Sequence, residues 1–475
     1  MANKKCPFAK KCSGCQLSNM TYEQQLEWKQ KDTEKLLGSF GKVSPIIGAD
    51  DPYNYRNKVQ AVFRSDRNGR IISGVYQSSR NGIVGIDSCM LDDKRADEII
   101  VGIRGLLKSF KLQPYDEGTE RGFLRHVLVR VGKNTGEILV TLVGGNSMFP
   151  KKHDFVKALV KQFPDITTVT FSVNRTPEML TLGNNNEVLY GEGYITDILC
   201  GKRFRISPHS FYQINHAQTE KLYDYAIKAA KLTKKDVLLD AYSGIGTIGI
   251  IASDYVKQVQ GIEYNASAVR DAVKNCHENG LTRNIAFNRG DAGEFLEKKA
   301  KLGTHYNAVI RDPARAGADR KFLNSLVKIA PERIVYISCN PATLARDCRM
   351  LADMGYCVEK IQPVDMFPWT YHVETVVLLS KGEVDSKKIR VEFSLEDMDM
   401  SEFQDGATYT QIKDYVLEHS GLKVSNLYIS QIKRKCGIEV GKNYNLPKSE
   451  DSRQPQCPPE KEKAIREAFK YFGMI

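Results

Sequence analysis

The chain has 475 residues, with 69 lysines and arginines against 57 aspartates and glutamates, which gives a formal charge of +12 and a pI near 9.0. Its composition, 41% hydrophobic and 27% charged, excludes a disordered chain. No apolar run approaches the roughly 18 residues that a membrane span needs, which excludes a membrane protein. The segment from Met1 to Lys11 is polar, which excludes a secretory signal. We therefore expect a cytoplasmic protein of about two to four domains, whose basic excess favours a polyanionic partner because each neutralised phosphate releases counterions.

Three cysteines, Cys6, Cys12 and Cys15, lie in a loop-like stretch at the start of the chain, and Cys89 follows the run GIVGID far downstream. A cytosolic chain keeps its thiols reduced, so this placement indicates metal binding or catalysis more than disulfides. Four thiolates satisfy an iron–sulfur cluster or a tetrahedral zinc site. Cys12 and Cys15 alone would also fit a redox pair, although the βαβ context expected for such a pair is missing.

The first half of the chain is predicted to be mostly β-structure after one helix. Residues 21–37 form a charged amphipathic pattern that ends at Gly38 and predicts this helix. Alternating runs separated by Asn-Gly turns predict strands, namely an antiparallel meander over 55–87, a hairpin over 123–145 and a strand over 166–174. We expect a cysteine-bearing domain with the meander over 1–95 and a β-rich region over 96–205.

The second half alternates helices of ten or more residues with short apolar runs, which is typical of βαβ units and a largely parallel sheet. We predict a Rossmann-like, doubly wound domain over 206–382. A small C-terminal α/β module is expected over 389–475, with a helix near 408–419, a basic stretch from Gln431 to Cys436 and an exposed Pro-rich connection before a final helix. The fold class is therefore α/β throughout its second half.

A glycine-rich turn follows the apolar run VLLDAY. Residues 240–249 read DAYSGIGTIG, in which Gly244 and Gly246 let the backbone bend sharply and approach a ligand. Glu263 ends the next apolar run, where its carboxylate can accept hydrogen bonds from both hydroxyls of a ribose. A GxGxxG match alone is weak, and a nicotinamide or flavin dinucleotide is the alternative. Asp240 favours S-adenosylmethionine instead, because its negative charge would repel a pyrophosphate.

Reactive residues follow two later apolar runs. Asp312 and Arg315 come after the run that ends at Arg311, and Cys339 comes after the run RIVYIS and before a helix. A thiol beside a helix N-terminus and arginines is expected to have a lowered pKa and to act as a nucleophile. Because Cys339 follows its apolar run, a structural role in the core is disfavoured. Glu374 opens the last run, and the residues leave it equally open as a water-facing cap or an active-site base.

At this point the chain resembles the RNA (uracil-5-)-methyltransferases, and in particular the iron–sulfur-bearing branch that acts on 23S rRNA. The resemblance rests on five blocks across the catalytic half: SFYQIN (210–215), DAYSGIG (240–246), DPARAG (312–317), SCNPATLARD (338–347) and DMFPWTYHVE (365–374). It implies that Cys339 is a covalent nucleophile and Glu374 a base. It also implies contacts to S-adenosylmethionine from Gln213, Tyr242, Glu263 and Asp312, with Gly244 in the cofactor loop, and a 4Fe–4S cluster on Cys6, Cys12, Cys15 and Cys89, with zinc as the alternative.

The resemblance implies methylation of C5 of a uridine in RNA, with 23S rRNA favoured and transfer RNA as the alternative. The rival classes are an NAD(P)- or flavin-dependent oxidoreductase with an accessory metal domain, and a non-catalytic RNA-binding protein built on a decayed methyltransferase. We expect RNA contacts from the β-rich region, through Arg121, Arg125 and Arg130, or from the C-terminal basic run Lys433 to Lys435. No obligate protein partner is evident, so we expect a monomer.

Overall fold

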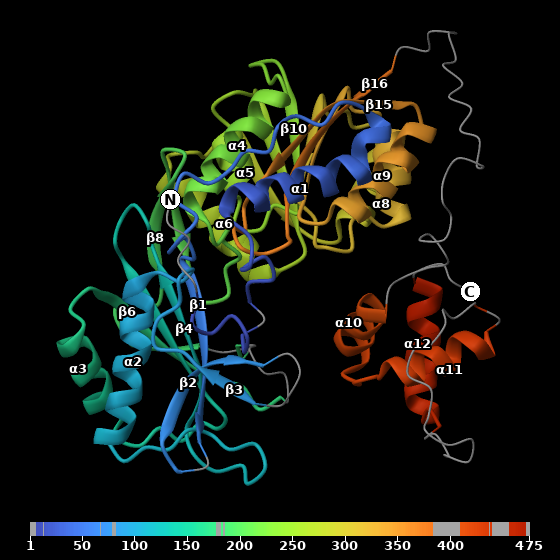
Figure 1. Cartoon of the computed structure of the whole chain (residues 1–475). Helices are drawn as coiled ribbons and strands as arrows, with labels where there is room; N and C mark the ends of the chain where they lie inside the picture. The colour runs from blue at the N-terminus through green and yellow to red at the C-terminus, as the bar shows by residue number, and fades with distance from the viewer. Residues whose placement is uncertain are drawn as a thin grey trace. The chain divides into compact units, whose positions relative to one another are not determined.

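The computed structural model describes residues 6–12, 14–66, 68–77, 82–176, 182–183, 186–382, 409–436, 438 and 456–471. They belong to two compact units, Met1–Asp385 and Ser386–Ile475 (Figure 1). None of the helices formed by these residues is long and apolar enough to cross a membrane.

The first unit contains two large sheets, of which the first has the strand order β3-β2-β1-β4-β5-β6-β7. Its strands are β1 Lys58–Ser65, β2 Ile71–Tyr76, β3 Ile83–Gly85, β4 Leu124–Val131, β5 Ile138–Gly144, β6 Ile166–Val173 and β7 Asn186–Tyr190. The antiparallel pairings β1–β2, β2–β3 and β4–β5 confirm the predicted meander and hairpin. This single sheet includes strands from both sides of residue 95, where the sequence suggested a boundary.

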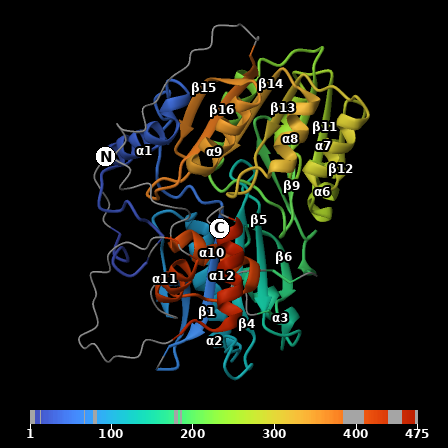
Figure 2. The same ribbon diagram turned by 90° about the vertical axis from the view of Figure 1, so that its right-hand side faces the viewer.

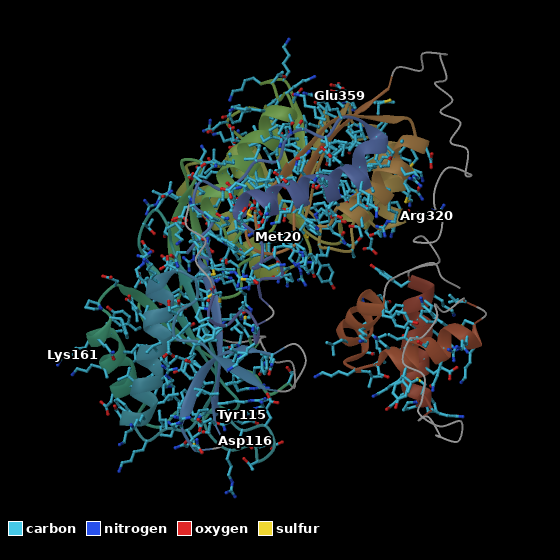
Figure 3. All side chains as sticks on the ribbon, in the orientation of Figure 1. Met20, Tyr115, Asp116, Lys161, Arg320 and Glu359 are labelled. Carbon is cyan, nitrogen blue, oxygen red and sulfur yellow. The ribbon has the colours of Figure 1, made fainter. Side chains whose placement is uncertain are left out.

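One face of the first sheet is covered by α2 Lys94–Ser109 and α3 Lys152–Gln162, whose apolar side chains form a common core with the strands. Alternate residues of a strand point to opposite faces, and Phe63 and Val129 point to this core. Figure 3 shows Lys161 of α3, and Tyr115 and Asp116 before β4, on the outer part of this half of the unit.

The second sheet has the order β12-β11-β10-β13-β14-β16-β15, and its strands follow one another across the upper part of Figure 2. They are β10 Val237–Ala241, β11 Gln258–Glu263, β12 Ile285–Arg289, β13 Ala308–Arg311, β14 Arg333–Ser338, β15 Tyr356–Val364 and β16 Glu374–Lys381. All neighbouring pairs are parallel except those made by β16, which is antiparallel to both β14 and β15. A short hairpin of β8 Ile195–Leu199 and β9 Lys202–Ile206 precedes the sheet.

Helices cover both faces of the second sheet, which confirms the predicted doubly wound, Rossmann-like domain. One face packs against α4 His216–Ala229, α5 Thr247–Ala252 and α6 Ala266–Glu278. The other packs against α1 Tyr22–Leu37, α7 Ala292–Lys301, α8 Arg320–Ile329 and α9 Pro341–Asp353. Successive residues of β10 divide between the two cores, with Leu238 in the first and Leu239 in the second.

Helix α1 belongs to the second sheet although it precedes the first sheet in the sequence. It begins after Thr21, whose side chain accepts from the Gln24 amide while the Gln24 side chain accepts from the Thr21 amide. This reciprocal cap satisfies two amides that the helix leaves free. Leu37, its last residue, is buried against the core on the α9 side, and the short turn η1 Gly38–Phe40 follows. The predicted helix and its end at Gly38 are confirmed.

The second unit was expected to be α/β, but the residues described there form three helices and no strand. These are α10 Tyr409–Ser420, α11 Asn426–Lys435 and α12 Pro459–Tyr471, around a small apolar core. The basic run of α11 is largely used inside the unit: Lys433 is buried with its ammonium 5.0 Å from the Tyr409 ring centroid, and Lys435 pairs with Glu462 at 2.6 Å. Residues 446–455 of the predicted Pro-rich connection, and residues 383–388, lie outside the described residues.

Candidate active site at the carboxyl edge of the second sheet

The predicted site residues meet at one edge of the second sheet. Because parallel strands end at the same edge, the ends of β10, β11, β13 and β14 bring together Tyr242, Glu263, Asp312 and Cys339. Strand β16 runs the opposite way, so its first residue, Glu374, lies at this edge too. Its register pairs Ser338 with Thr375 and so places Cys339 and Glu374 on adjoining strands.

The glycine turn after β10 holds the carboxylate of Glu263. The Gly244 amide donates to Glu263 Oε2 at 3.0 Å and the Asn265 amide donates to Oε1 at 2.7 Å. A Cβ added to Gly244 would meet no heavy atom within 4 Å, so the space beside this turn is open. Gly246 has φ +84°, and a Cβ there would lie 2.7 Å from the Phe287 ring, so the turn requires glycine at this position.

A second buried carboxylate, Asp240, lies beneath the turn. Its Oδ2 accepts from the Gly249 amide at 2.8 Å, and its buried Oδ1 has no partner among the described residues. Burial raises the pKa of Asp240 to about 7. S-adenosylmethionine presents an ammonium group and two ribose hydroxyls, all hydrogen-bond donors, so acceptors on Asp240 and Glu263 beside open space fit it. A pyrophosphate would meet carboxylates instead.

Gln213 and Asp312 approach each other from different elements. Gln213 Nε2 donates to Asp312 Oδ2 at 3.4 Å. The loop that carries Gln213 is held by Asn57, whose Nδ2 donates to the Gln213 carbonyl at 2.9 Å. Burial raises the pKa of Asp312 to about 7, while the Gln213 hydrogen bond and the Arg311 charge oppose the rise. The structure thus brings together two residues that the sequence separates widely.

Tyr242 lies in the core rather than in open space. Its backbone has φ +66°, and its half-buried ring lies 5.5 Å from the Phe322 ring. Beneath both rings is the fully buried guanidinium of Arg311, 4.0 Å from the Tyr336 ring centroid, and its nitrogens have no hydrogen-bond partner in the described part of the chain. Burial raises the pKa of Tyr242 to about 12. A contact from Tyr242 to the methyl donor stays a prediction.

Cys339 is half-buried directly before α9, but its thiol does not have the lowered pKa expected from the sequence. Burial raises the pKa of Cys339 to about 12, the negative charges of Glu374 and Asp312 add to the rise, and the Arg315 charge opposes it. The expectation was wrong because the sequence shows the helix and the arginines beside the cysteine. It does not show that two carboxylates converge there.

Glu374 is 3% exposed, and its buried Oε2 has no hydrogen-bond partner among the described residues. This excludes the water-facing cap that the sequence left open. Burial, together with the negative charge of Asp312, holds the pKa of Glu374 well above its usual range, and Arg315 opposes the rise. A carboxylate whose pKa is raised holds a proton more strongly once it has taken one, which suits a general base.

Arg315 is the cation that opposes the raised pKa of both Cys339 and Glu374. Its Nη2 donates to His372 Nε2 at 3.2 Å, and burial lowers the pKa of His372 to about 4, so this imidazole is neutral and can accept. The Arg315 carbonyl accepts from Thr343 Oγ1 at 3.1 Å, which ties the loop to α9. The sequence predicts that arginines near Cys339 favour its thiolate, and the structure identifies Arg315 as a cation that favours both this thiolate and the Glu374 carboxylate.

The N-terminal cysteines converge only in part. Cys12, Cys15 and Cys89 line one cavity of about 160 Å³ together with Arg56 and Asp97. Burial raises the pKa of Cys15 to about 11, and the thiolate charges of Cys12 and Cys6 contribute. Within the described residues no three histidine, cysteine or acidic side chains are arranged to hold a metal ion. A metal or cluster on the four cysteines therefore stays a prediction.

Two of the three arginines expected to bind RNA are not available. Arg125 is buried and donates to the Asn174 carbonyl at 2.8 Å, and it pairs with Glu117 at 3.1 Å. Arg130 is buried and donates to the carbonyl of Ser210. The expectation was wrong for both because every residue of β4 is buried, on either face. Arg121, before the strand, is exposed.

Several known proteins are similar to this chain. Residues 21–382 match the family model described as tRNA (Uracil-5-)-methyltransferase. An uncharacterized RNA methyltransferase of Halalkalibacterium halodurans is 40% identical over 379 residues, which cover 79% of this chain and 82% of that protein. One of Oceanobacillus iheyensis is 40% identical over 375 residues, which cover 78% and 81%. The crystal structure of Pyrococcus abyssi tRNA (uracil-54, C5)-methyltransferase in complex with S-adenosyl-L-homocysteine has a TM-score of 0.65 and 28% identity, and the match covers 77% of this chain and 86% of that one.

Proposed function

Since this chain belongs to the tRNA (uracil-5-)-methyltransferase family, we propose that it methylates C5 of a uridine in RNA with Cys339 as the covalent nucleophile and Glu374 as the base. Membership confirms the resemblance drawn from the five sequence blocks and makes the chain an S-adenosylmethionine-dependent RNA (uracil-5-)-methyltransferase. The dinucleotide oxidoreductase is thereby set aside. The roles of individual residues and the identity of the RNA are the new part of the proposal.

The main support for this proposal is the antiparallel pairing of β16 with β14. It places Glu374 on the strand that adjoins Cys339, with Asp312 on the other side of β14. A nucleophile and a base must act on neighbouring atoms of one ring, C6 and C5, so they must approach the ring from one small region. Adjoining strand ends supply that region.

The chemistry follows from the weak nucleophilicity of uracil C5. The Cys339 thiolate attacks C6, a carbon–sulfur bond forms, and the electrons of the 5,6 double bond pass to C5 as an enolate. When bound, S-adenosylmethionine would supply an electrophilic methyl group on a positively charged sulfur, and C5 would bond to this methyl carbon as the methyl–sulfur bond breaks and its electrons pass to the neutral thioether that leaves. Glu374 then takes the proton from C5, the double bond re-forms, and the bond from C6 to sulfur breaks to return the thiolate. General-base assistance of this kind is worth about two to four orders of magnitude in rate.

Both Cys339 and Glu374 must lose a proton before they can react, and Arg315 is the charge that favours this. A thiol with a pKa of about 12 is ionised to only roughly one part in 10⁵ at neutral pH. Arg315 is the nearby cation that favours both the Cys339 thiolate and the Glu374 carboxylate. Because these groups lie at a largely buried strand edge, the target uridine must leave its stack or lie in a loop to reach them.

The RNA we propose is 23S rRNA, on the strength of the four cysteines that the chain shares with the iron–sulfur-bearing branch. The similarity to the Pyrococcus abyssi transfer-RNA enzyme favours transfer RNA as the second candidate. Mapping 5-methyluridine in both RNA classes after deletion of the gene separates them. We expect the loss of a site in 23S rRNA with transfer RNA unchanged. A loss confined to transfer RNA would reject the ribosomal substrate, and no loss in either would reject the function.

We further propose that Cys6, Cys12, Cys15 and Cys89 hold a 4Fe–4S cluster, with zinc as the alternative. The support is the shared cavity of three of these thiols and the proximity of the Arg56 cation, which suits a site of several thiolates. Protein purified without oxygen should be brown and contain about four iron atoms per chain. Cys89→Ser should lose the iron, whereas the exposed Cys357→Ser should keep it. One zinc per chain without iron would overturn the cluster.

A further inference from the structure

Residues 365–373 connect β15 to β16 and lead directly into the base. The register pairs Val364 with Glu374, so the connection leaves one strand and returns on its neighbour at the same edge. The position of the side chain that follows such a connection is only as well defined as the backbone of the connection. What holds residues 365–373 therefore decides where the Glu374 carboxylate lies.

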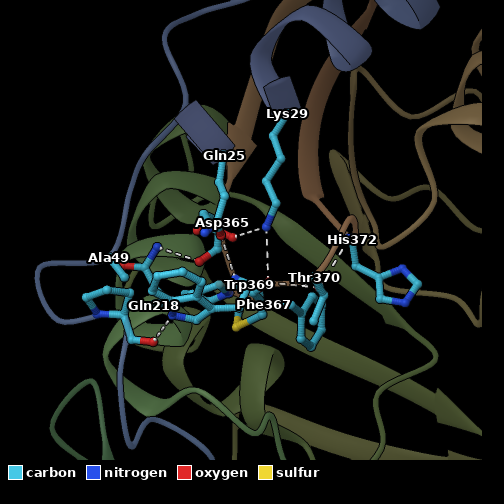
Figure 4. A network of polar contacts seen from close by, with 12 residues as sticks. Gln25, Lys29, Ala49, Gln218, Asp365, Phe367, Trp369, Thr370 and His372 are labelled. Atoms are coloured by element: carbon cyan, nitrogen blue, oxygen red, sulfur yellow. Dashed lines mark hydrogen bonds and ion pairs between the residues drawn. The ribbon is translucent and has the colours of Figure 1, made fainter. Parts of the chain in front are cut away.

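The first anchor is a fully buried ion pair with helix α1. Lys29 Nζ lies 2.6 Å from Asp365 Oδ1, and both side chains have no exposed surface (Figure 4). The second carboxylate oxygen, Oδ2, accepts from the Tyr22 hydroxyl at 2.8 Å. Lys29 Nζ also donates to the carbonyl of Phe367 at 3.0 Å. One lysine thus fixes both a side chain and the backbone of the connection.

The second anchor is Trp369, whose backbone has φ +72°, in the left-handed region that costs free energy for a residue with a side chain. Three hydrogen bonds hold this conformation. The Trp369 amide donates to Gln25 Oε1 at 2.8 Å, its carbonyl accepts from the Leu17 amide at 3.1 Å, and its indole Nε1 donates to the Pro52 carbonyl at 3.0 Å. Helix α1 and the segments on either side of it therefore determine the path of the connection.

A series of hydrogen bonds connects Lys29, through the backbone of the connection and His372, to Arg315. The Phe367 carbonyl, which accepts from Lys29, also accepts from Thr370 Oγ1 at 2.8 Å. Thr370 Oγ1 accepts from the His372 amide at 3.2 Å (Figure 4). His372 Nε2 accepts from Arg315 at 3.2 Å, and Arg315 is the cation that acts on both Cys339 and Glu374.

A buried ion pair is a poor source of stability, because removing two charges from water costs about as much free energy as their attraction returns. Its defined geometry can instead select one conformation of the segment that it holds. We propose that Lys29 and Asp365 are positioning residues that hold Glu374 and His372 in place for the reaction, so that helix α1 is part of the catalytic apparatus. This rests on the proposed function, because it requires Glu374 to act as the base.

The inference has a kinetic signature that a merely structural role lacks. Cys339 lies between β14 and α9, outside the connection, and the ion pair reaches it only through His372 and Arg315, so attack on C6 depends on the ion pair less than proton removal does. Removal of the C5 proton does need it, because Glu374 follows the connection. Loosening the connection should therefore slow the release of the product from Cys339 more than its attachment, and the covalent protein–RNA adduct should accumulate.

The test uses the full-length chain with RNA from a strain in which the gene is deleted. Lys29→Met leaves Asp365 unpaired, so the double variant Lys29→Met/Asp365→Asn, which removes both charges, is measured beside it. The control, Arg333→Met/Asp236→Asn, removes an ion pair of 3.0 Å at the opposite edge of the same sheet. The measurements are turnover, affinity for S-adenosylmethionine and the fraction of protein in a denaturation-resistant RNA adduct.

We expect the double variant to lose about a hundredfold in turnover, the loss typical of a reacting group displaced by about 1 Å, with unchanged donor affinity and a raised adduct fraction. The control should keep the adduct fraction of the wild type. Wild-type turnover in the double variant, or lost turnover without added adduct, would overturn the inference. If wild-type protein makes no 5-methyluridine and Glu374→Gln forms no adduct, the proposed function fails instead.

Discussion

Replacing Cys339 by alanine should remove 5-methyluridine formation almost entirely, by about four or more orders of magnitude, the loss seen when a covalent nucleophile is deleted. Without the thiolate, nothing saturates the 5,6 double bond, and C5 stays too weak a nucleophile to take the methyl group. Binding of S-adenosylmethionine and of RNA should persist, because Cys339 accepts none of the hydrogen bonds that hold Glu263, Asp240 or Gln213. Transfer of labelled methyl groups to RNA in a single turnover measures the effect.

The matched control is Cys357→Ala, which removes an exposed thiol from β15 in the same sheet. It should leave turnover unchanged, since it lies at the start of β15 and away from the edge that carries the site. Measurable turnover in Cys339→Ala, at more than about a hundredth of the wild-type rate, would show that the reaction does not need this sulfur.

Glu374→Gln should also lose turnover, by about a hundredfold to ten-thousandfold. Unlike Cys339→Ala, it should form a protein–RNA adduct that survives a denaturing gel. Glutamine has the shape of the glutamic acid but cannot take the C5 proton, so the methylated adduct has no route to release. The variant should fold well. The pKa of Glu374 is raised in the folded state, so ionising it disfavours folding and the stability contribution of this residue is lost as pH rises through the folded pKa.

We therefore expect the melting temperature of Glu374→Gln to be no lower than that of the wild type at pH values above the usual pKa of glutamate. At those pH values the wild type must either bury the charge of Glu374 or keep it protonated, and a neutral glutamine needs neither. A melting temperature well below that of the wild type would show that Glu374 is structural.

The pH dependence of adduct formation gives an independent test of Cys339. Glu374→Gln removes one of the charges that raise the pKa of Cys339, but burial, the larger cause, remains. The rate of adduct formation in this variant should therefore still rise with pH between about pH 6 and 9, by up to about tenfold per pH unit while the thiol stays mostly protonated.

Much of the site could be predicted from the sequence because it is built from strand ends. Apolar runs alternating with helices predict a parallel sheet, and parallel strands bring their ends to one edge. Asp240, Glu263, Asp312 and Cys339 could therefore be placed together before the structure was known. The direction of β16 could not, because its apolar pattern is the same in either direction, and so the place of Glu374 beside Cys339 comes from the structure.

The wrong expectations for Cys339 and for the two arginines share one physical cause, the neglect of burial and of distant charges. Cys339 was expected to ionise easily from its neighbours along the chain, but its pKa depends on Glu374 and Asp312 across the sheet. Arg125 and Arg130 were expected to face RNA, but both lie on a strand that is buried on both sides. Local patterns give the element in which a residue lies, and only the packing gives its surroundings.

The contribution of α1 shows the same limit. The charged amphipathic pattern over residues 21–37 predicts this helix from the sequence alone. Nothing local marks Lys29, in a run of polar residues, as fully buried against Asp365 more than three hundred positions later. A lysine in a charged amphipathic helix is usually exposed, and only the partner reveals otherwise.

The proposed mechanism requires a bond between the sulfur of Cys339 and a uridine, and mass spectrometry of the Glu374→Gln adduct tests it directly. After digestion with nuclease and protease, we expect a single modified peptide that contains Cys339 and carries a methylated uridine nucleotide. A nucleotide attached to any other cysteine, or continued methylation with no attached nucleotide, would contradict it.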